Sequence, residues 1–305
     1  MKEDNNIPTQ FPLQKELLDL LKELLPLHSV NVISVQKEKK KKEIFLSPKC
    51  TNPQKLVIYT LLIITHKPIS KRLGEFMDDV FNKMQHRCKI YAIMYTLSNA
   101  KKRLDFGNNF LSQAVFQTPC IYKYDNSLLK FKNFPLLFYH KIYQRILDTW
   151  KTRMDRAEYL LSAVDGSESR EDSTARLSVM HYAIEQVCMA LIYVFWEYQP
   201  KHYSLSYLLH LCSHFTQLPQ TIFPKETYGL HRIYYMLCNA QHIMRFKVKD
   251  EFSQGDTDKA YNRCEEFYYE AKKLGEKQLE QLQELHCKQS NQKSSLKLEC
   301  HEKQS

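Results

Sequence analysis

The sequence predicts an α+β protein, with a small α/β domain followed by an all-α, up-and-down helical bundle. Three observations support this fold class. Apolar runs alternate with amphipathic segments up to about residue 128, five helical segments with no strand between them follow, and only 6 of the 305 residues are glycine. So few glycines argue against folds that need many tight turns or glycine-rich phosphate loops.

The first domain is expected at residues 1–128. It begins with an amphipathic helix, because Leu17, Leu20, Leu21 and Leu24 lie on one face. The run at 56–65 is almost wholly apolar, which predicts a central strand. Together the patterns predict helices at 11–27, 70–86, 98–104 and 108–115, and strands at 30–35, 43–47, 56–65, 89–97 and 120–125.

The helical bundle is expected at residues 129–287, with a polar tail at 288–305 that is expected to be disordered. Turn signals separate its segments. Apolar stripes within them are explained by core packing, so no cofactor is expected. The predicted helices cover residues 138–163, 172–198, 204–215, 225–245 and 257–286.

The charge balance favours contact with polyanions. Lys and Arg number 44 against 34 Asp and Glu, a formal charge of +10, although part of the excess lies in the lysine run at 37–42 and in the tail. A polar N-terminus and the absence of a long apolar run predict a cytoplasmic protein without a membrane partner. Nine cysteines form no CxxC pair, so most are expected to be buried thiols.

The helical half resembles HEPN domains of the kind that Bacteroidetes-type proteins fuse to an N-terminal nucleotidyltransferase-like domain. The segments ARLSVMHYAIEQVCMALIYVF, YSLSYLLHLC and LHRIYYMLCNAQHIMRFKV match the order and spacing of that family. The first half resembles the degenerate nucleotidyltransferase-like domain through LVIYTLLIIT, SKRLGEFMDDVFNKMQHRC, KIYAIMYTL and FGNNFLSQAVFQTPCIYKYD. The resemblance covers most of the chain.

Both sets of catalytic residues that the resemblance implies are missing. Active nucleotidyltransferases carry two metal-binding carboxylates on a strand, where this chain has Ile58, Tyr59 and Thr60. HEPN ribonucleases use an Arg and a His with four to six residues between them, and those positions are Gln241 and Arg245 here. We therefore expect no metal site and no nucleotidyl transfer, and any remaining enzyme activity would be that of a metal-independent ribonuclease.

Two other pairs have suggestive spacings. Arg176 and His181 have the HEPN spacing, but five positions along a helix separate two side chains by roughly 140°, so we interpret them as an exposed Arg and a partly buried His. His210 and His214 are four apart and could bind a metal with His231 or His242 as a third ligand. The favoured interpretation of this second pair is ordinary packing or surface histidines.

The favoured site candidate is the segment 239–249, at the position of the family's active site. Its cationic, amide and aromatic side chains are of the types that contact phosphates and stack on bases. A solvated basic turn is the alternative. The candidate nucleic-acid-binding residues are Asn239, Gln241, His242, Arg245, Lys247 and Lys249, with Phe246 beside them, and His242 and Arg245 are the candidate catalytic residues.

Three functions remain open. The first is a catalytically degenerate HEPN-domain protein that binds RNA, a nucleotide or a protein partner in a regulatory or defence-type, toxin-antitoxin-like role. The second is a HEPN ribonuclease with a rearranged site, and the third is a purely structural oligomerisation module. HEPN domains commonly dimerise through helix faces, so we expect a homodimer. Tyrosines that could form either its interface or the core are Tyr182, Tyr193, Tyr198, Tyr234, Tyr235, Tyr268 and Tyr269.

Overall fold

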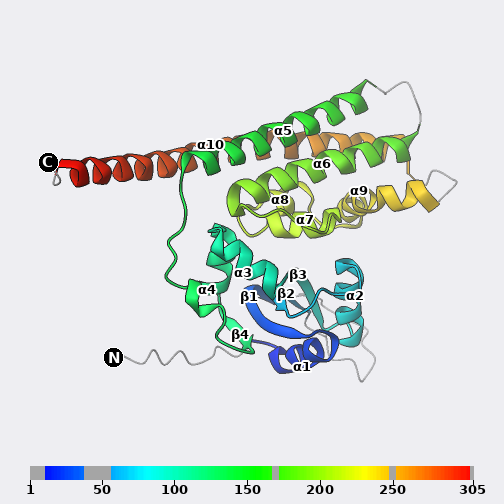
Figure 1. The fold of residues 1–305 in the computed structure, drawn as a ribbon. Coiled ribbons are helices and arrows are strands. Elements are labelled where there is room, and N and C mark those ends of the chain that lie inside the picture. The colour runs from blue at the N-terminus through cyan, green and yellow to red at the C-terminus, as the bar shows by residue number, and fades with distance from the viewer. Residues whose placement is uncertain (1–10, 38–55, 167–171, 247–251, 303–305) are drawn as a thin grey trace. The chain divides into compact units, whose positions relative to one another are not determined.

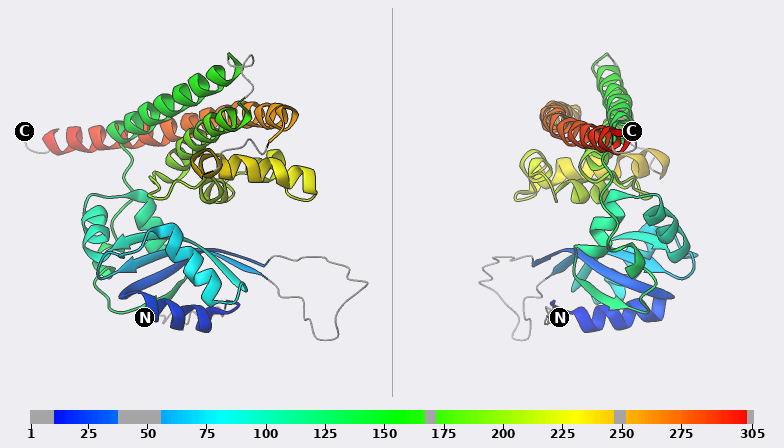
Figure 2. Two further views of the ribbon diagram at one scale, coloured as in Figure 1. Left: turned by 90° about the vertical axis from the view of Figure 1, so that its right-hand side faces the viewer. Right: turned by 60° about the vertical axis from the view of Figure 1, so that its left-hand side comes forward.

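The computed structural model describes residues 11–37, 56–166, 172–246 and 252–302 (Figure 1). The chain divides into two compact units, Met1–Leu137 and Phe138–Ser305. The first holds a small sheet with helices and the second is helical, so the mixed α+β class is confirmed (Figure 2).

The sheet of the first unit has four strands among the described residues, in the order β3-β2-β1-β4. The strand β1 (Leu27–Lys37) pairs antiparallel with β2 (Val57–Thr65) and with β4 (Cys120–Lys123), and β2 pairs parallel with β3 (Cys88–Thr96). These strands confirm four of the five predicted ones, and the fifth, at 43–47, falls outside the described residues. The expectation that 56–65 is a central strand is also confirmed.

Helices cover both faces of this sheet. The helices α1 (Gln14–Leu24) and α2 (Leu73–Lys83) share one core cluster with alternate strand residues such as Tyr59, Leu61 and Ile63. On the other face lie α3 (Leu97–Asp105), which contacts β2 and β3, and α4 (Asn109–Phe116), which contacts β1. Because side chains alternate along a strand, the nearly continuous apolar run of β2 can supply both layers.

The first unit extends beyond residue 128, where the sequence placed its end. A short 3₁₀ helix, η1 (Leu129–Phe131), buries Phe131. The Asn109 side chain then binds the backbone of Leu137 twice, donating from Nδ2 to the carbonyl over 2.8 Å and accepting from the N–H over 2.7 Å. Residues 129–137 therefore belong to the first unit because these contacts hold them there.

The second unit is built around α6 (Ser173–Trp196), which contacts α5 (His140–Asp165), α7 (Leu205–Cys212), α9 (Tyr228–Phe246) and α10 (Gln254–Glu302). By length and composition α6 could cross a membrane, but 78% of its apolar window is buried inside the unit, as in the core helix of a soluble protein. The close packing of α10 on α5 needs Gly275, because a Cβ there would lie 2.0 Å from the buried Trp150 ring.

All five helices predicted for this unit are present, and two differences stand out. The helix α8 (Leu218–Ile222) was missed because five residues are too few to show a helical period. The described backbone of α10 continues to Glu302 and so includes residues 288–302, which the sequence analysis assigned to the polar tail. Residues 288–302 contain no Gly or Pro, so nothing in them ends a helix.

The described cysteines are free thiols, as expected. No disulfide joins them, and four of the six are buried: Cys88, Cys188, Cys212 and Cys264. Burial raises the pKa of Cys88 to about 12, which keeps it protonated and unreactive at neutral pH.

Candidate functional site

The last two turns of α9 form the site that the sequence indicated. Leu237, Ala240 and Ile243 are buried and hold this part of the helix to the bundle. The helical period then turns His242 and Arg245 outward, where both are exposed. Phe246 is 69% exposed, and its ring centroid lies 4.8 Å from that of His242. Cationic and aromatic groups therefore share one exposed helix end.

The polar groups of this helix end are mostly uncommitted. Neither His242 nor Arg245 forms a hydrogen bond or an ion pair with another described residue, whereas the Asn239 amide donates to the Tyr235 carbonyl over 2.9 Å. Gln241 is half-buried. The other two predicted residues, Lys247 and Lys249, lie outside the described residues.

Such a surface can contact a phosphate and stack on a base. A guanidinium without a protein partner keeps its N–H donors for phosphate oxygens, and the face of an exposed aromatic ring gives a sequence-tolerant stacking contact. General acid–base catalysis by a histidine also requires a neighbouring group, because a hydrogen bond to that group normally fixes the tautomer of the catalytic imidazole. Among the described residues no side chain or carbonyl does this for His242.

The pair with HEPN spacing, Arg176 and His181, is part of the core of the helical unit. Arg176 is 7% exposed, which corrects the expectation of an exposed Arg, and it forms an ion pair with Asp258 of α10 over 3.1 Å. His181 is 4% exposed, and its Nδ1 lies 2.7 Å from the carbonyl oxygen of Leu237 in α9. Burial lowers the pKa of His181 despite this hydrogen bond. Both residues fasten α6 to its neighbours.

His210 and His214 also serve packing. Their ring centroids are 5.2 Å apart, and His214 Nδ1 lies 3.1 Å from the carbonyl oxygens of both His210 and Leu211. Burial lowers the pKa of His214, whose ring lies against Trp196. The described part of the chain brings together no group of three His, Cys, Asp or Glu side chains able to hold a metal ion.

The strand positions that would hold carboxylates in an active nucleotidyltransferase are occupied by core side chains. Tyr59 and Thr60 are fully buried. The Tyr59 hydroxyl donates to the Pro12 carbonyl over 2.6 Å, and the Ser34 hydroxyl donates to Thr60 Oγ1 over 3.0 Å. These contacts join β2 to the chain before α1 and to β1, which is a structural role.

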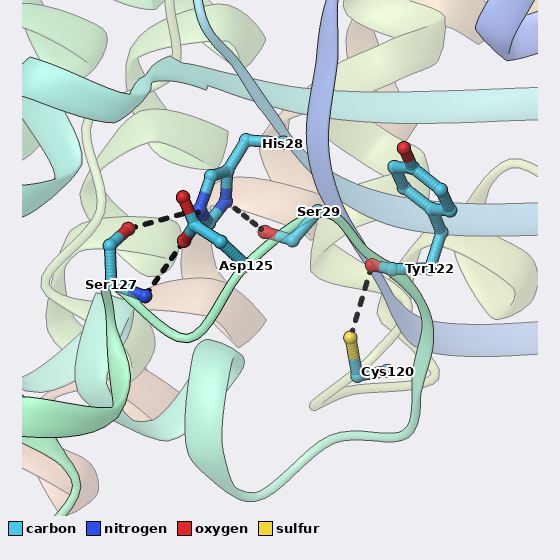
Figure 3. Close-up of polar contacts among 6 residues, drawn as sticks. All are labelled: His28, Ser29, Cys120, Tyr122, Asp125 and Ser127. Atoms are coloured by element: carbon cyan, nitrogen blue, oxygen red, sulfur yellow. Dashed lines mark hydrogen bonds and ion pairs between the residues drawn. The ribbon is translucent and has the colours of Figure 1, made fainter.

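A buried polar network in the first unit has no counterpart in the sequence analysis (Figure 3). His28, at the start of β1, is 1% exposed. Its Nε2 lies 3.0 Å from Asp125 Oδ1 and 3.2 Å from Ser127 Oγ, and its Nδ1 lies 3.3 Å from Ser29 Oγ. These contacts fit the tautomer with the proton on Nε2, donating to the carboxylate.

This network has the residue types of a hydrolase triad but not the access. Ser29 is 4% exposed and His28 is even less exposed, so neither meets a substrate. Hydrogen bonds from the Ser127 backbone and hydroxyl, then from His28, hold the pKa of Asp125 well below its usual range. The network fastens β1 to the turn after β4. No local motif could reveal it, because His28 and Asp125 are 97 residues apart.

The tyrosines of the bundle divide into core and surface. Tyr198 and Tyr268 are buried, Tyr193 and Tyr234 are half-buried, and Tyr182, Tyr235 and Tyr269 are exposed. The sequence left both roles open, and the structure assigns residues to each.

Comparison with known proteins gives little further information. No family model matches the sequence, and no curated protein matches it. The structure is similar to the crystal structure of a nucleotidyltransferase-like protein from Exiguobacterium sibiricum, with a TM-score of 0.28 and 12% identity. The match covers 88% of this chain and 78% of that one. A TM-score this low does not establish a shared fold.

Proposed function

We propose that this protein binds RNA through the exposed end of α9 and does not cleave it. In this proposal a nucleotidyltransferase-like domain without metal-binding carboxylates is joined to a HEPN-like bundle without its Arg–His pair, and the protein acts in a regulatory, toxin-antitoxin-like role in the cytoplasm. The observation that supports it is the exposed pair of Arg245 and His242, which form no hydrogen bond or ion pair with another described residue and lie beside the exposed Phe246 ring.

Charge and chemistry agree with RNA as the ligand. The formal charge of +10 favours a polyanion at long range. At contact, the Arg245 guanidinium supplies phosphate donors, and the rings of His242 and Phe246 supply a stacking surface for an unpaired base. Affinity carried by phosphate contacts falls steeply with salt, whereas the stacking contribution does not.

The ribonuclease alternative rests on the same side chains. His242 and Arg245 are three residues apart on a helix, so their side chains lie on one side of it. An imidazole next to a guanidinium could in principle act on a ribose hydroxyl and its phosphate. The absence of a tautomer-fixing partner among the described residues is why binding alone is preferred.

The test is a gel-shift and cleavage assay of the full chain with labelled transfer RNA and a labelled single-stranded RNA, at two salt concentrations. We expect retarded, intact RNA, and a roughly tenfold or greater loss of affinity in Arg245→Glu, because the substitution replaces a phosphate donor with a repelling charge. Lys151→Glu changes an exposed cation of α5 by the same charge and should have little effect.

Other outcomes would reject the proposal in different ways. RNA cleavage that disappears in His242→Ala would favour the ribonuclease. No retardation, together with a stable dimer by analytical ultracentrifugation, would favour the structural module. A homodimer through the helical bundle belongs to our proposal as well, supported by the exposed Tyr182, Tyr235 and Tyr269. It is compatible with RNA binding, so the gel shift decides between the two functions.

A further inference from the structure

A second feature of the helical unit lies at the opposite end of α9. The first turns of α9 and α10 border a cavity of about 450 Å³, a volume typical of small-molecule sites. Three basic side chains line it: Arg232, Lys259 and Arg263. Its other polar lining comes from Thr227, Asn262, Asp256 and Glu266.

Two of the basic groups are held in place by the fold. Arg232 Nε donates to Asp256 Oδ2 over 3.1 Å, and Arg263 Nη1 donates to the carbonyl of Ile222, the last residue of α8, over 2.7 Å. Each contact occupies one of the five N–H donors of a guanidinium. The remaining donors are pre-organised, so little side-chain entropy is lost when they bind a ligand.

The third basic group gives the cavity lining an excess of positive charge. Lys259 is exposed and forms no ion pair with another described residue. The cavity lining carries three cationic and two anionic side chains, so its formal charge is positive although Asp256 acts on both Arg232 and Lys259. The cavity also takes in the first turn of α9, whose backbone carries partial positive charge. An anion is therefore favoured over a cation or a neutral ligand.

We propose that this cavity binds a phosphate monoester of about the size of a nucleotide. Lys259 and Arg263 would contact the phosphate, because a guanidinium and an ammonium suit its tetrahedral oxygens. A single phosphate would leave most of the volume empty, whereas Leu230 and Ile233 in the lining can contact an organic group. The site is separate from the proposed RNA surface, which lies about 20 Å further along α9 at the rise of an α-helix.

The first experiment is isothermal titration calorimetry of the full chain with adenosine 5′-monophosphate, inorganic phosphate and adenosine. We expect the monophosphate to bind more tightly than inorganic phosphate, and adenosine to bind at least tenfold more weakly than the monophosphate. No heat from either phosphate compound at millimolar concentration would overturn the proposal, as would equal affinities for adenosine and its monophosphate.

Two glycines give a matched pair of variants that leave the packing intact. Gly229 lines the cavity and Gly255, in the first turn of α10, is not among its lining residues. A Cβ at either glycine meets no heavy atom within 4 Å, so neither Gly229→Leu nor Gly255→Leu clashes at its first side-chain atom, and circular dichroism checks that both variants fold. Gly229→Leu fills the cavity and should abolish binding of the monophosphate, whereas Gly255→Leu should preserve it. Equal behaviour of the two variants would overturn the proposal.

Charge variants locate the phosphate. Lys259→Ala should lower the affinity for the monophosphate at least tenfold. Lys277→Ala, which removes an exposed lysine later in α10, should leave this affinity unchanged. Arg245→Glu shows whether the monophosphate binds in the cavity or at the RNA surface. If that variant loses the monophosphate and Gly229→Leu keeps it, the anion binds at the end of α9 and the cavity proposal is wrong.

Discussion

The start of β1 and the end of α9 each present a histidine, in opposite surroundings. His28 is 1% exposed and has hydrogen-bond partners on both ring nitrogens, one of them a carboxylate. His242 is exposed and has a neighbouring phenyl ring but no polar partner among the described residues. His28, which has the larger number of polar partners, is thus closed to substrates. His242, which has none among the described residues, is open to solvent.

This difference shows how to separate a structural histidine from a functional candidate. A buried polar side chain must have its hydrogen bonds satisfied, so a network around it is the expected result of burial and does not by itself indicate catalysis. An exposed side chain has no such requirement. Uncommitted donors beside an exposed aromatic ring are therefore the stronger sign of a binding surface.

The largest effect should come from His28→Ala. The change removes a buried ring and leaves Ser29 without its partner, so the free energy of unfolding of the first unit should fall by about 3 kcal/mol. Urea unfolding followed by circular dichroism measures this, and hydrogen exchange of the β1 amides assigns it to the sheet. Ser127→Ala removes only the hydroxyl, which contacts His28 and Asp125, and should cost less, about 1 kcal/mol. An unchanged stability with altered RNA affinity would reverse the roles given to His28 and His242.

The next effect is a pH dependence due to buried histidines of the helical unit. Burial lowers the pKa values of His181 and His214, so the unfolded chain takes up protons first as the pH falls. Stability is then complete above about pH 6.5 and is lost below it, by at most about 1.4 kcal/mol per pH unit for each histidine.

Unfolding curves at pH 7.5, 6.5 and 5.5 test this pH dependence. In His181→Gln the slope of stability against pH should be smaller, whatever the cost of the substitution itself. Equal slopes in wild type and His181→Gln would show that His181 is not responsible.

The smallest effect on stability is expected for His242→Ala, within about 0.5 kcal/mol of the wild type, because an exposed side chain without partners stabilises little. The same variant should still weaken RNA binding a few-fold by removing a stacking ring. Differential scanning fluorimetry and the gel shift measure the two quantities on one sample. A large loss of stability would mean that His242 is part of the packing of α9.

Periodicity and apolar runs predicted the elements well, because those features depend on neighbours in the sequence. The apolar run at 56–65 predicted β2, and the helical segment predicted at 172–198 corresponds to α6. The features that the sequence did not predict depend on contacts between residues far apart in the chain. Arg176 is buried because Asp258, 82 residues later, pairs with it, and the environment of His28 depends on residues that follow β4.

The candidate site was predicted only in part for the same reason. The residue types at the end of α9 could be read from the sequence, whereas packing in the bundle determines that His242 and Arg245 point outward and that Gln241 is half-buried. The cavity at the start of α9 was not predicted, since it needs α9 and α10 side by side. Lys259 and Arg263 have no distinguishing sequence context on a helix rich in charges.

The double hydrogen bond between Asn109 and Leu137 determines where the chain can be divided. A cut after residue 128 would strip the first unit of Phe131 and leave the buried Asn109 amide without its strongest contacts. Gly107, at a φ of +69°, adds a steric fit, since a Cβ there would lie 2.0 Å from Leu137 Cδ1. The chain can therefore be divided without loss of these contacts only after Leu137. Any exchange of helical bundles between related chains must keep the contacts of Asn109 and Gly107 with Leu137.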